Sequence, residues 1–104
     1  MKTKPTVFYL KFTPEAQEDV KTTAQYYEAQ LAGLGKRFRM EVRNQLLLVK
    51  QNPFSRAIRY GSVRFAVIDK FPYSIHYTIH QQQITIHAII SDYRNPKEYW
   101  KHND

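Results

Sequence analysis

Hydrophobic residues recur at every second position in two neighbouring segments, residues 73–80 and residues 84–90. The first set is Tyr73, Ile75, Tyr77 and Ile79, and the second set is Ile84, Ile86, Ala88 and Ile90. A period of two is typical of a β-strand with one buried face and one open face. Residues 63–68 fit a third strand of the same sheet if the inward residues are Val63, Phe65 and Val67. The pattern therefore predicts a three-stranded antiparallel meander.

The alternation also predicts how these strands pair, because a shift of one residue would turn every apolar side chain outward. Matching the apolar faces across the turn at residues 81–83 gives the pairs Tyr77 with Ile86, Ile75 with Ala88, Thr78 with Thr85, His76 with His87, and Arg64 with Thr78. We therefore expect Arg64, His76 and His87 to share the open face of the sheet. A half-exposed sheet without any active site would show the same polar alternation.

Residues 13–51 carry the hydrophobic spacing of two helices. Thr13 and Pro14 are typical of a helix start, and the glycines at 33 and 35 let the chain reverse. The apolar stripe of the first helix is Ala16, Val20, Ala24, Tyr27 and Leu31. The second helix is expected from Lys36 to Gln51, with the core stripe Phe38, Val42, Leu46 and Val49. A strand from Thr6 to Phe12 precedes both helices, with one side formed by Phe8, Leu10 and Phe12.

The expected order of elements is β-α-α-β-β-β, which indicates an α+β fold. In this fold a helical hairpin covers one face of a small antiparallel sheet. With 104 residues the chain suits a single domain spanning residues 1–104. The absence of Cys excludes disulfides, thiolate metal sites and a cysteine nucleophile. No stretch is long enough for a signal peptide or a membrane span, so we expect a cytoplasmic protein.

The positive charge of the chain is concentrated in its central segment. Residues 33–70 hold nine Lys or Arg against two acidic residues, a net charge of +7, whereas residues 1–32 and 71–104 are each neutral. A concentrated basic patch attracts nucleic acid or an acidic protein partner. A solvated face that only aids solubility would have the same composition.

One face of the second predicted helix gathers four basic side chains beside two apolar ones. They are Lys36, Arg39, Arg43 and Lys50, flanked by Met40 and Leu47. In one interpretation Met40 and Leu47 pack against the first helix while the basic side chains are solvated. In the other interpretation these six residues bind a segment of a partner protein.

Five local motifs, in this order along the chain, resemble those of the RelE/ParE toxin superfamily. They are Gly33-Leu-Gly-Lys-Arg-Phe38, Asn52-Pro53, Val63-Arg64, Phe71-Pro-Tyr73, and Arg94-Asn-Pro96 followed by Trp100. The resemblance covers the chain from Phe12 to Trp100. It implies a small basic toxin of a bacterial type II toxin–antitoxin system. It also implies a hetero-oligomer in which an acidic, partly disordered antitoxin neutralises the toxin.

Members of this superfamily differ in their target. Some cut mRNA in the ribosome without a metal, and others, of the ParE type, poison DNA gyrase. The short glycine-bounded hairpin and the turn at residues 71–73 resemble the ParE type. Ser74 and His76 stand in the region where ribosome-dependent nucleases carry an arginine, and Ser91 stands where many relatives carry a histidine. The resemblance thus implies a gyrase inhibitor, with a RelE-like endoribonuclease as the alternative.

If the chain is a nuclease, its candidate catalytic residues are Arg64, His76, His87, Tyr93 and Arg94. RNA cleavage through the 2′-hydroxyl needs a base, an acid and a cation, and histidine titrates near neutrality. We expect no cofactor and no metal, because two facing histidines would lack a third zinc ligand. A second alternative is a non-toxic nucleic-acid-binding module, whose affinity would fall steeply with salt.

Overall fold

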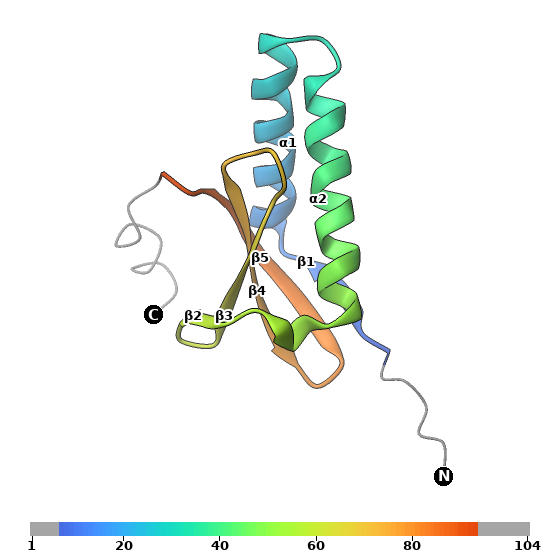
Figure 1. The fold of residues 1–104 in the computed structure, drawn as a ribbon, viewed down its shortest axis with the longest axis vertical. Helices are drawn as coiled ribbons and strands as arrows, with labels where there is room; N and C mark the ends of the chain where they lie inside the picture. The colour runs from blue at the N-terminus through green and yellow to red at the C-terminus, as the bar shows by residue number, and fades with distance from the viewer. Residues whose placement is uncertain (1–6, 94–104) are drawn as a thin grey trace.

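The computed structural model describes residues 7–93, which form an α+β fold as expected. Its elements are β1 (Tyr9–Phe12), α1 (Pro14–Gln30), α2 (Leu34–Gln51), the short 3-10 helix η1 (Pro53–Ser55), β2 (Ile58–Tyr60), β3 (Val63–Val67), β4 (Tyr73–His80) and β5 (Gln83–Ser91). The strand β2 and the helix η1 are additions that the sequence pattern did not predict. Thr6, Arg94, Pro96 and Trp100 lie outside the described residues. Figure 1 shows the α1–α2 hairpin rising beyond the end of the sheet.

The five strands form one mixed sheet in the order β1-β5-β4-β3-β2. β1 runs parallel to β5, with Tyr9 opposite Gln83 and Phe12 opposite Ile86, whereas the other neighbours are antiparallel. The expectation of a wholly antiparallel sheet is therefore wrong at β1. The helical hairpin and three strands separate β1 from β5, so no tight turn forces these two strands to be antiparallel. β1 and β2 are the two edges of the sheet.

The turn between α1 and α2 is held by the carboxylate of Glu28. This carboxylate accepts hydrogen bonds from the backbone N–H groups of Gly33 at 2.9 Å and Gly35 at 3.0 Å. Both bonds lower the pKa of Glu28, because they stabilise the ionised form. Gly33 has a φ of +91°, a left-handed conformation that favours glycine, and α2 starts directly after it at Leu34. The second helix thus begins two residues before the expected Lys36.

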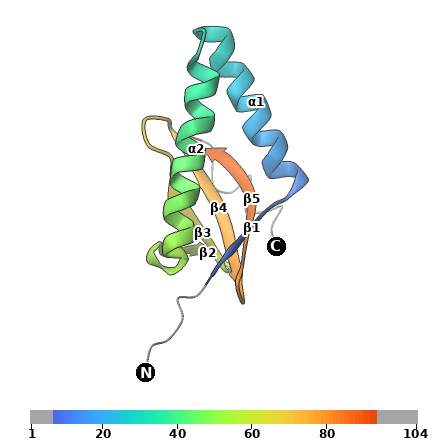
Figure 2. The same cartoon turned by 90° about the vertical axis from the view of Figure 1, so that its right-hand side faces the viewer.

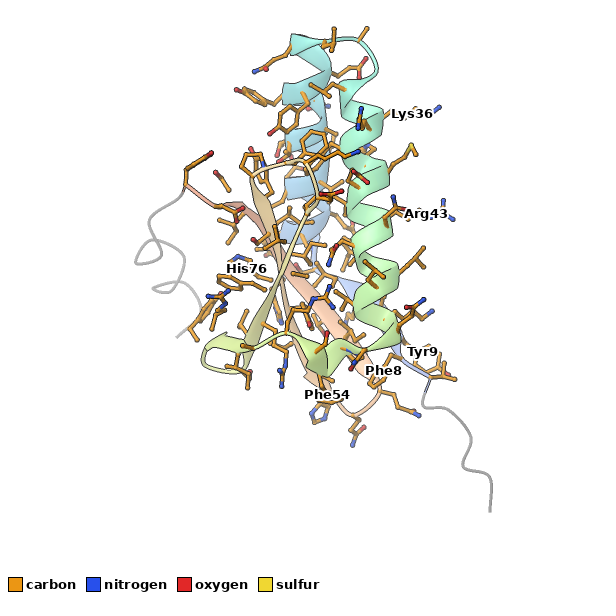
Figure 3. All side chains as sticks on the ribbon, viewed as in Figure 1. Phe8, Tyr9, Lys36, Arg43, Phe54 and His76 are labelled. Carbon is orange, nitrogen blue, oxygen red and sulfur yellow. The ribbon has the colours of Figure 1, made fainter. Side chains whose placement is uncertain are left out.

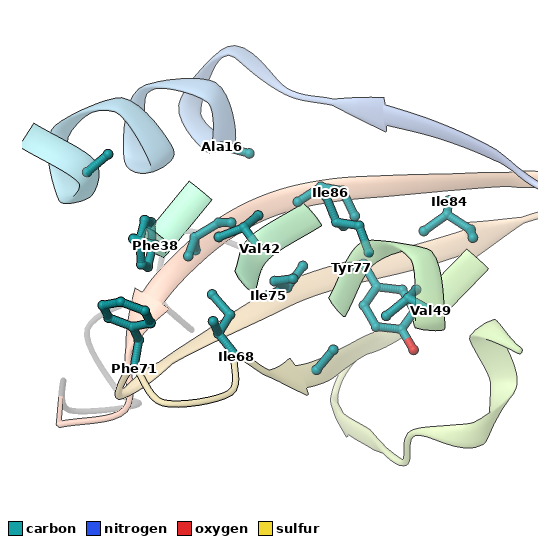
Figure 4. Close-up of a cluster of buried hydrophobic side chains, with 14 residues drawn as sticks. Ala16, Phe38, Val42, Val49, Ile68, Phe71, Ile75, Tyr77, Ile84 and Ile86 are labelled. Carbon is teal, nitrogen blue, oxygen red and sulfur yellow. The ribbon is translucent and has the colours of Figure 1, made fainter. Parts of the chain in front are cut away.

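The core lies between the helical hairpin and one face of the sheet (Figure 4). All four residues of the predicted α2 stripe are buried. On α1, Ala16 and Ala24 are buried, whereas Leu31 is 63% exposed because the helix ends at Gln30. The sheet contributes Ala66, Ile75, Tyr77, Ile84, Ile86 and Ile89. Within residues 7–93 neither helix has the length and apolar character to cross a membrane.

Candidate functional site

Arg64 lies on the helix-covered side of the sheet and not on the outer face, the face turned away from the helices. It pairs with Tyr77, a core residue with no exposed surface, and not with Thr78 as expected. Residues that pair directly across two strands point to the same side, so Arg64 shares the side of Tyr77. The error is a shift of one residue, which is enough to reverse the faces of β3.

The side chains of β3 confirm this reversal. Ala66 is fully buried in the core, whereas Val67, which was expected to point inward, is 59% exposed. Phe65 was also expected in the core, but it pairs with His76 on the outer face. Of the three residues predicted to point inward, Val63 alone is buried.

The guanidinium group of Arg64 is bound to the connector between α2 and β2. Nη1 of Arg64 donates hydrogen bonds to the carbonyl oxygens of Phe54, at 3.4 Å, and Arg56. The guanidinium carbon also lies 5.4 Å from the centre of the Phe54 ring. The buried hydroxyl of Tyr77 donates to the carbonyl oxygen of Pro53 at 2.7 Å. Arg64 and Tyr77 therefore fix three carbonyl groups of this connector, which gives Arg64 a structural role.

A β-bulge in β5 changes the pairing around the two histidines. Two expected pairs are confirmed, Tyr77 with Ile86 and Thr78 with Thr85, and two are wrong, because His76 pairs with Ala88 and Ile75 pairs with Ile89. The register shift leaves His87 as the extra residue of β5. Two side chains at the start of α1 form hydrogen bonds with the backbone of the bulge. Thr13 Oγ1 donates to the His87 carbonyl at 3.1 Å, and Asp19 Oδ2 accepts from the Ile89 N–H at 3.0 Å.

Thr13 also confirms the predicted start of α1. Its side-chain oxygen accepts a hydrogen bond from the backbone N–H of Ala16 at 3.1 Å, which is the geometry of an N-cap. The same hydroxyl therefore caps the helix and contacts the bulge. This double contact ties the orientation of α1 to the part of β5 that carries His87.

His76 lies on the outer face as expected, but it is not open to solvent. It is only 2% exposed, and its ring is stacked on the ring of Phe65 with 3.7 Å between the centroids. Burial, with a smaller contribution from the nearby His87, lowers the pKa of His76 to about 4. Figure 3 shows His76 within the side-chain layer beside the sheet. The prediction of an open polar face is therefore wrong at this residue.

His87 shares the outer face with His76, although the two residues are not paired. Its Nε2 lies 2.7 Å from Oγ1 of Thr78, within hydrogen-bonding distance. Burial lowers the pKa of His87, and the carboxylate of Glu15 opposes this effect. Both histidines are therefore predominantly neutral near pH 7.

The remaining candidate catalytic residues do not complete an active site within residues 7–93. Tyr93 is 85% exposed, and Arg94 lies outside the described part of the chain. Arg64 is separated from both histidines because it lies on the other side of the sheet. Residues 7–93 also contain no group of three or more His, Asp or Glu that could hold a metal ion.

The basic face of α2 is exposed along its whole length. Its members Lys36, Arg39, Arg43 and Lys50 are all exposed. Met40 is 54% exposed and Leu47 is 50% exposed, so neither side chain is buried against α1. Figure 3 shows Lys36 and Arg43 on the side of α2 that points away from α1.

A groove of about 510 Å³ opens beside this face, between β1 and the two helices. It is lined by Leu10 and Phe12 of β1, Gln17 and Val20 of α1, and Arg39, Val42, Arg43, Leu46 and Leu47 of α2. Figure 2 shows β1 running from the lower end of α2 to the start of α1. The lining is mostly apolar, and Arg39 and Arg43 supply its positive charge. Leu10 and Phe12 belong to the predicted apolar side of the first strand, and Val20 belongs to the predicted apolar stripe of the first helix. The pattern did not indicate that all three stay partly accessible beside an edge strand.

A family model described as the ParE toxin of the type II toxin–antitoxin system parDE matches residues 10–96 of the chain. The chain belongs to the ParE toxin family. The resemblance seen in the sequence motifs is thereby confirmed. The protein is a toxin of a type II toxin–antitoxin system, and its family implies an antitoxin partner in a complex.

The fold of this ParE-family toxin also agrees with a solved structure described as "Chromosomal ParDE TA system from P. aeruginosa". The two chains superpose with a TM-score of 0.74 and are 18% identical in sequence. The alignment covers 84% of this chain and 98% of the other one. At this identity the likeness shows a common fold. No curated protein matches the sequence significantly.

Proposed function

We propose that this ParE-family toxin blocks growth in the cytoplasm by binding DNA gyrase, and that an acidic, partly disordered antitoxin neutralises it. The position of Arg64 carries the preference for binding over catalysis. Its guanidinium group contacts backbone carbonyls on the helix side of the sheet, whereas His76 and His87 lie on the outer face.

A metal-independent ribonuclease requires a base, an acid and a cation around one phosphate group. Arg64 and His76 are on opposite sides of the sheet, so they cannot contact the same phosphate. A histidine with a pKa of about 4 is also a poor general acid at neutral pH, because it is almost never protonated there. These observations favour a toxin that acts through a protein-binding surface.

Induced expression of the toxin alone tests the target. We expect a DNA-damage response with intact full-length transcripts, and inhibition of DNA supercoiling when purified toxin is added to purified gyrase. The antitoxin is the matched control: its co-expression should restore growth, and its addition to the purified proteins should restore supercoiling. Loss of intact mRNA with normal supercoiling would reject the proposal in favour of the ribonuclease alternative.

The groove beside α2 is the site we propose for the antitoxin. Its apolar lining suits the hydrophobic side of an amphipathic helix, and Arg39 and Arg43 suit acidic residues along the edge of that helix. A disordered antitoxin segment loses conformational freedom on binding, and burial of apolar surface in the groove offsets that cost. The central charge of +7 favours an acidic partner in the same way.

Two neighbouring leucines of α2 provide a matched test of this site. Leu47 and Leu48 are both 50% exposed, but only Leu47 lines the groove. We expect Leu47→Asp to weaken antitoxin binding by at least about tenfold, because it puts a charge against the apolar helix. Leu48→Asp should leave the affinity within about twofold of wild type. Equal losses in the two variants, measured by titration calorimetry, would place the antitoxin elsewhere.

A further inference from the structure

Five exposed residues of α2 follow one another at intervals of four, three, four and three positions. They are Lys36, Met40, Arg43, Leu47 and Lys50. Positions with this spacing lie along one side of a helix and form the seam by which two helices pack in a coiled coil. In this stripe two apolar residues alternate with three basic ones. We call these five residues the outward stripe.

The outward stripe is displayed on a rigid support. The other side of α2 is buried through Phe38, Val42, Leu46 and Val49, and the Glu28 carboxylate fixes the turn that leads into the helix. Little conformational freedom of α2 would therefore be lost on binding, which favours affinity. Figure 3 shows Lys36 and Arg43 projecting from the same side of the helix.

The charges of the outward stripe select the kind of partner. A second copy of this chain is a poor partner, because an antiparallel pairing brings Arg43 against Arg43 and Lys36 against Lys50. A parallel pairing brings each basic residue against its own counterpart. Like charges at a helix–helix seam oppose association. The stripe is complementary to a helix of a different kind. Such a helix has apolar residues opposite Met40 and Leu47, and it has Asp or Glu opposite the three basic residues.

A shallow hollow at the upper end of the stripe strengthens this selection. It is lined by Lys36, Arg37, Met40 and Glu41 of α2, by Gly33, and by Lys70 from the β3–β4 connection. Three basic residues thus surround Met40, with Glu41 as the one acidic residue of the lining. An acidic side chain from the partner would be attracted to this hollow when the apolar contact at Met40 forms.

We propose that the outward stripe is the surface that binds the toxin's protein target, through an acidic amphipathic helix of that target. Arg43 and Leu47 belong both to the stripe and to the groove that we assign to the antitoxin. An antitoxin helix in the groove covers these two residues and therefore excludes the target helix. This inference rests on the proposed function, because it requires a protein target and an antitoxin in the groove.

Four charge reversals of equal size separate the two surfaces. Lys50→Glu changes the stripe alone, Arg39→Glu changes the groove alone, Arg43→Glu changes both, and Lys21→Glu on α1 is the charge-matched control. We expect Lys50→Glu to weaken gyrase binding and growth arrest by about tenfold or more while antitoxin affinity stays within about twofold. Arg39→Glu should do the opposite, Arg43→Glu should weaken both, and Lys21→Glu should weaken neither.

A second stripe variant, Met40→Asp, tests one of the two apolar positions of the stripe, and circular dichroism checks that each variant is folded. Full toxicity of both Lys50→Glu and Met40→Asp would overturn the inference, as would equal effects of Arg39→Glu and Lys50→Glu on both partners. Growth arrest is scored independently of gyrase. If wild-type toxin leaves gyrase unaffected, the proposed target is wrong, whereas the stripe is still supported or refuted by the growth phenotype of its variants.

Discussion

Tyr77 packs in the core and also binds the connector between α2 and β2. Its ring has no exposed surface, and its hydroxyl donates to the Pro53 carbonyl at 2.7 Å. Burial raises the pKa of the Tyr77 hydroxyl, although Arg56 and Arg64 lower it in part, so the hydroxyl stays protonated and able to donate. One atom of one core residue thus helps to fix the position of the whole connector.

Replacing Tyr77 by Phe isolates this hydrogen bond. The ring stays buried, but the Pro53 carbonyl loses its donor, so we expect the free energy of unfolding to fall by about 1 to 2 kcal/mol. Tyr9→Phe is the control, because Tyr9 is 61% exposed and its loss of a hydroxyl should cost less than about 0.5 kcal/mol. Urea unfolding of both variants measures the difference. Equal stability of the two variants would mean that the bond to Pro53 contributes nothing.

His76 should make the stability of the domain depend on pH. Its pKa is about 4 in the folded state and about 6.5 in the unfolded chain, so between these values the unfolded state binds more protons. Stability due to this group is therefore fully present above pH 6.5 and is lost as the pH falls toward 4. The expected loss is on the order of 2 to 3 kcal/mol.

The variant His76→Phe tests this prediction, because phenylalanine keeps a ring against Phe65 but cannot titrate. Urea unfolding at pH 7 and pH 4.5 should show a smaller loss of stability in the variant than in the wild type. The comparison of the two pH differences removes the contribution of His87, whose pKa is also lowered. Identical differences in both proteins would show that His76 is not kept neutral by burial.

The faces of the sheet were only partly predictable at the residue scale. The alternation in β4 correctly places Tyr77 inward and His76 outward, because apolar and polar residues alternate strictly along this strand. In β3 every position from 63 to 68 except Arg64 is apolar. The pattern therefore cannot tell which of the two possible registers the strand adopts. The bulge at His87 left a weak signal, since the buried isoleucines 84, 86 and 89 change their spacing from two to three.

At the scale of elements, the α1–α2 hairpin depends on close contact at Gly35. A Cβ atom added at this glycine would lie 2.5 Å from the carbonyl oxygen of Ala24 and 3.0 Å from Cβ of Glu28. The first neighbour is backbone and cannot move without moving α1. The absence of a side chain at position 35 thus allows the start of α2 to approach α1 closely.

Gly35→Ala should therefore destabilise the domain although alanine favours a helix. The clash is expected to cost about 1 to 3 kcal/mol, as overpacking typically does, whereas the gain in helix propensity is at most about 1 kcal/mol. Asn44→Ala, at an exposed position of the same helix, is the control and should change stability by less than about 0.5 kcal/mol. A thermal midpoint for Gly35→Ala equal to or above that of wild type would contradict the clash.

Long periodic elements were the part of the fold that the sequence predicted well. Both helices exceed 16 residues, and their stripes and the Thr13 cap are strong local signals. β2 has only three residues, which is too short for a period to be read, whereas the strand predicted over residues 6–12 is present as β1 from Tyr9 to Phe12. The parallel pairing of β1 with β5 joins residues more than 70 positions apart, so no local pattern encodes it. The groove follows from that pairing and was missed with it.

At the scale of the whole molecule, the basic segment and the two helices coincide. Five of the nine basic residues of segment 33–70 lie on α2, and none of them is buried. α1 carries three acidic residues in its first half and a fourth, Glu28, near its end. The exposed side of α2 is thus the most positive surface element, and it borders the apolar groove. The acidic antitoxin that we propose would be attracted by these charges first and would then bury its apolar side chains in the groove.

This arrangement predicts how salt should affect binding of the antitoxin. Exposed charges act over about 10 Å at 0.1 M salt and over about 3 Å at 1 M salt, so attraction before contact is screened as salt is added. We expect the association rate constant to fall by about tenfold between low and high salt, because long-range attraction speeds encounter. The dissociation rate constant should change by less than about twofold, because apolar contacts in the groove hold the complex. Stopped-flow mixing at several salt concentrations separates the two rates. The double variant Arg39→Gln/Arg43→Gln, which removes both positive charges of the groove, should show a shallower salt dependence of association. A slope unchanged from wild type would mean that these charges of α2 do not attract the antitoxin.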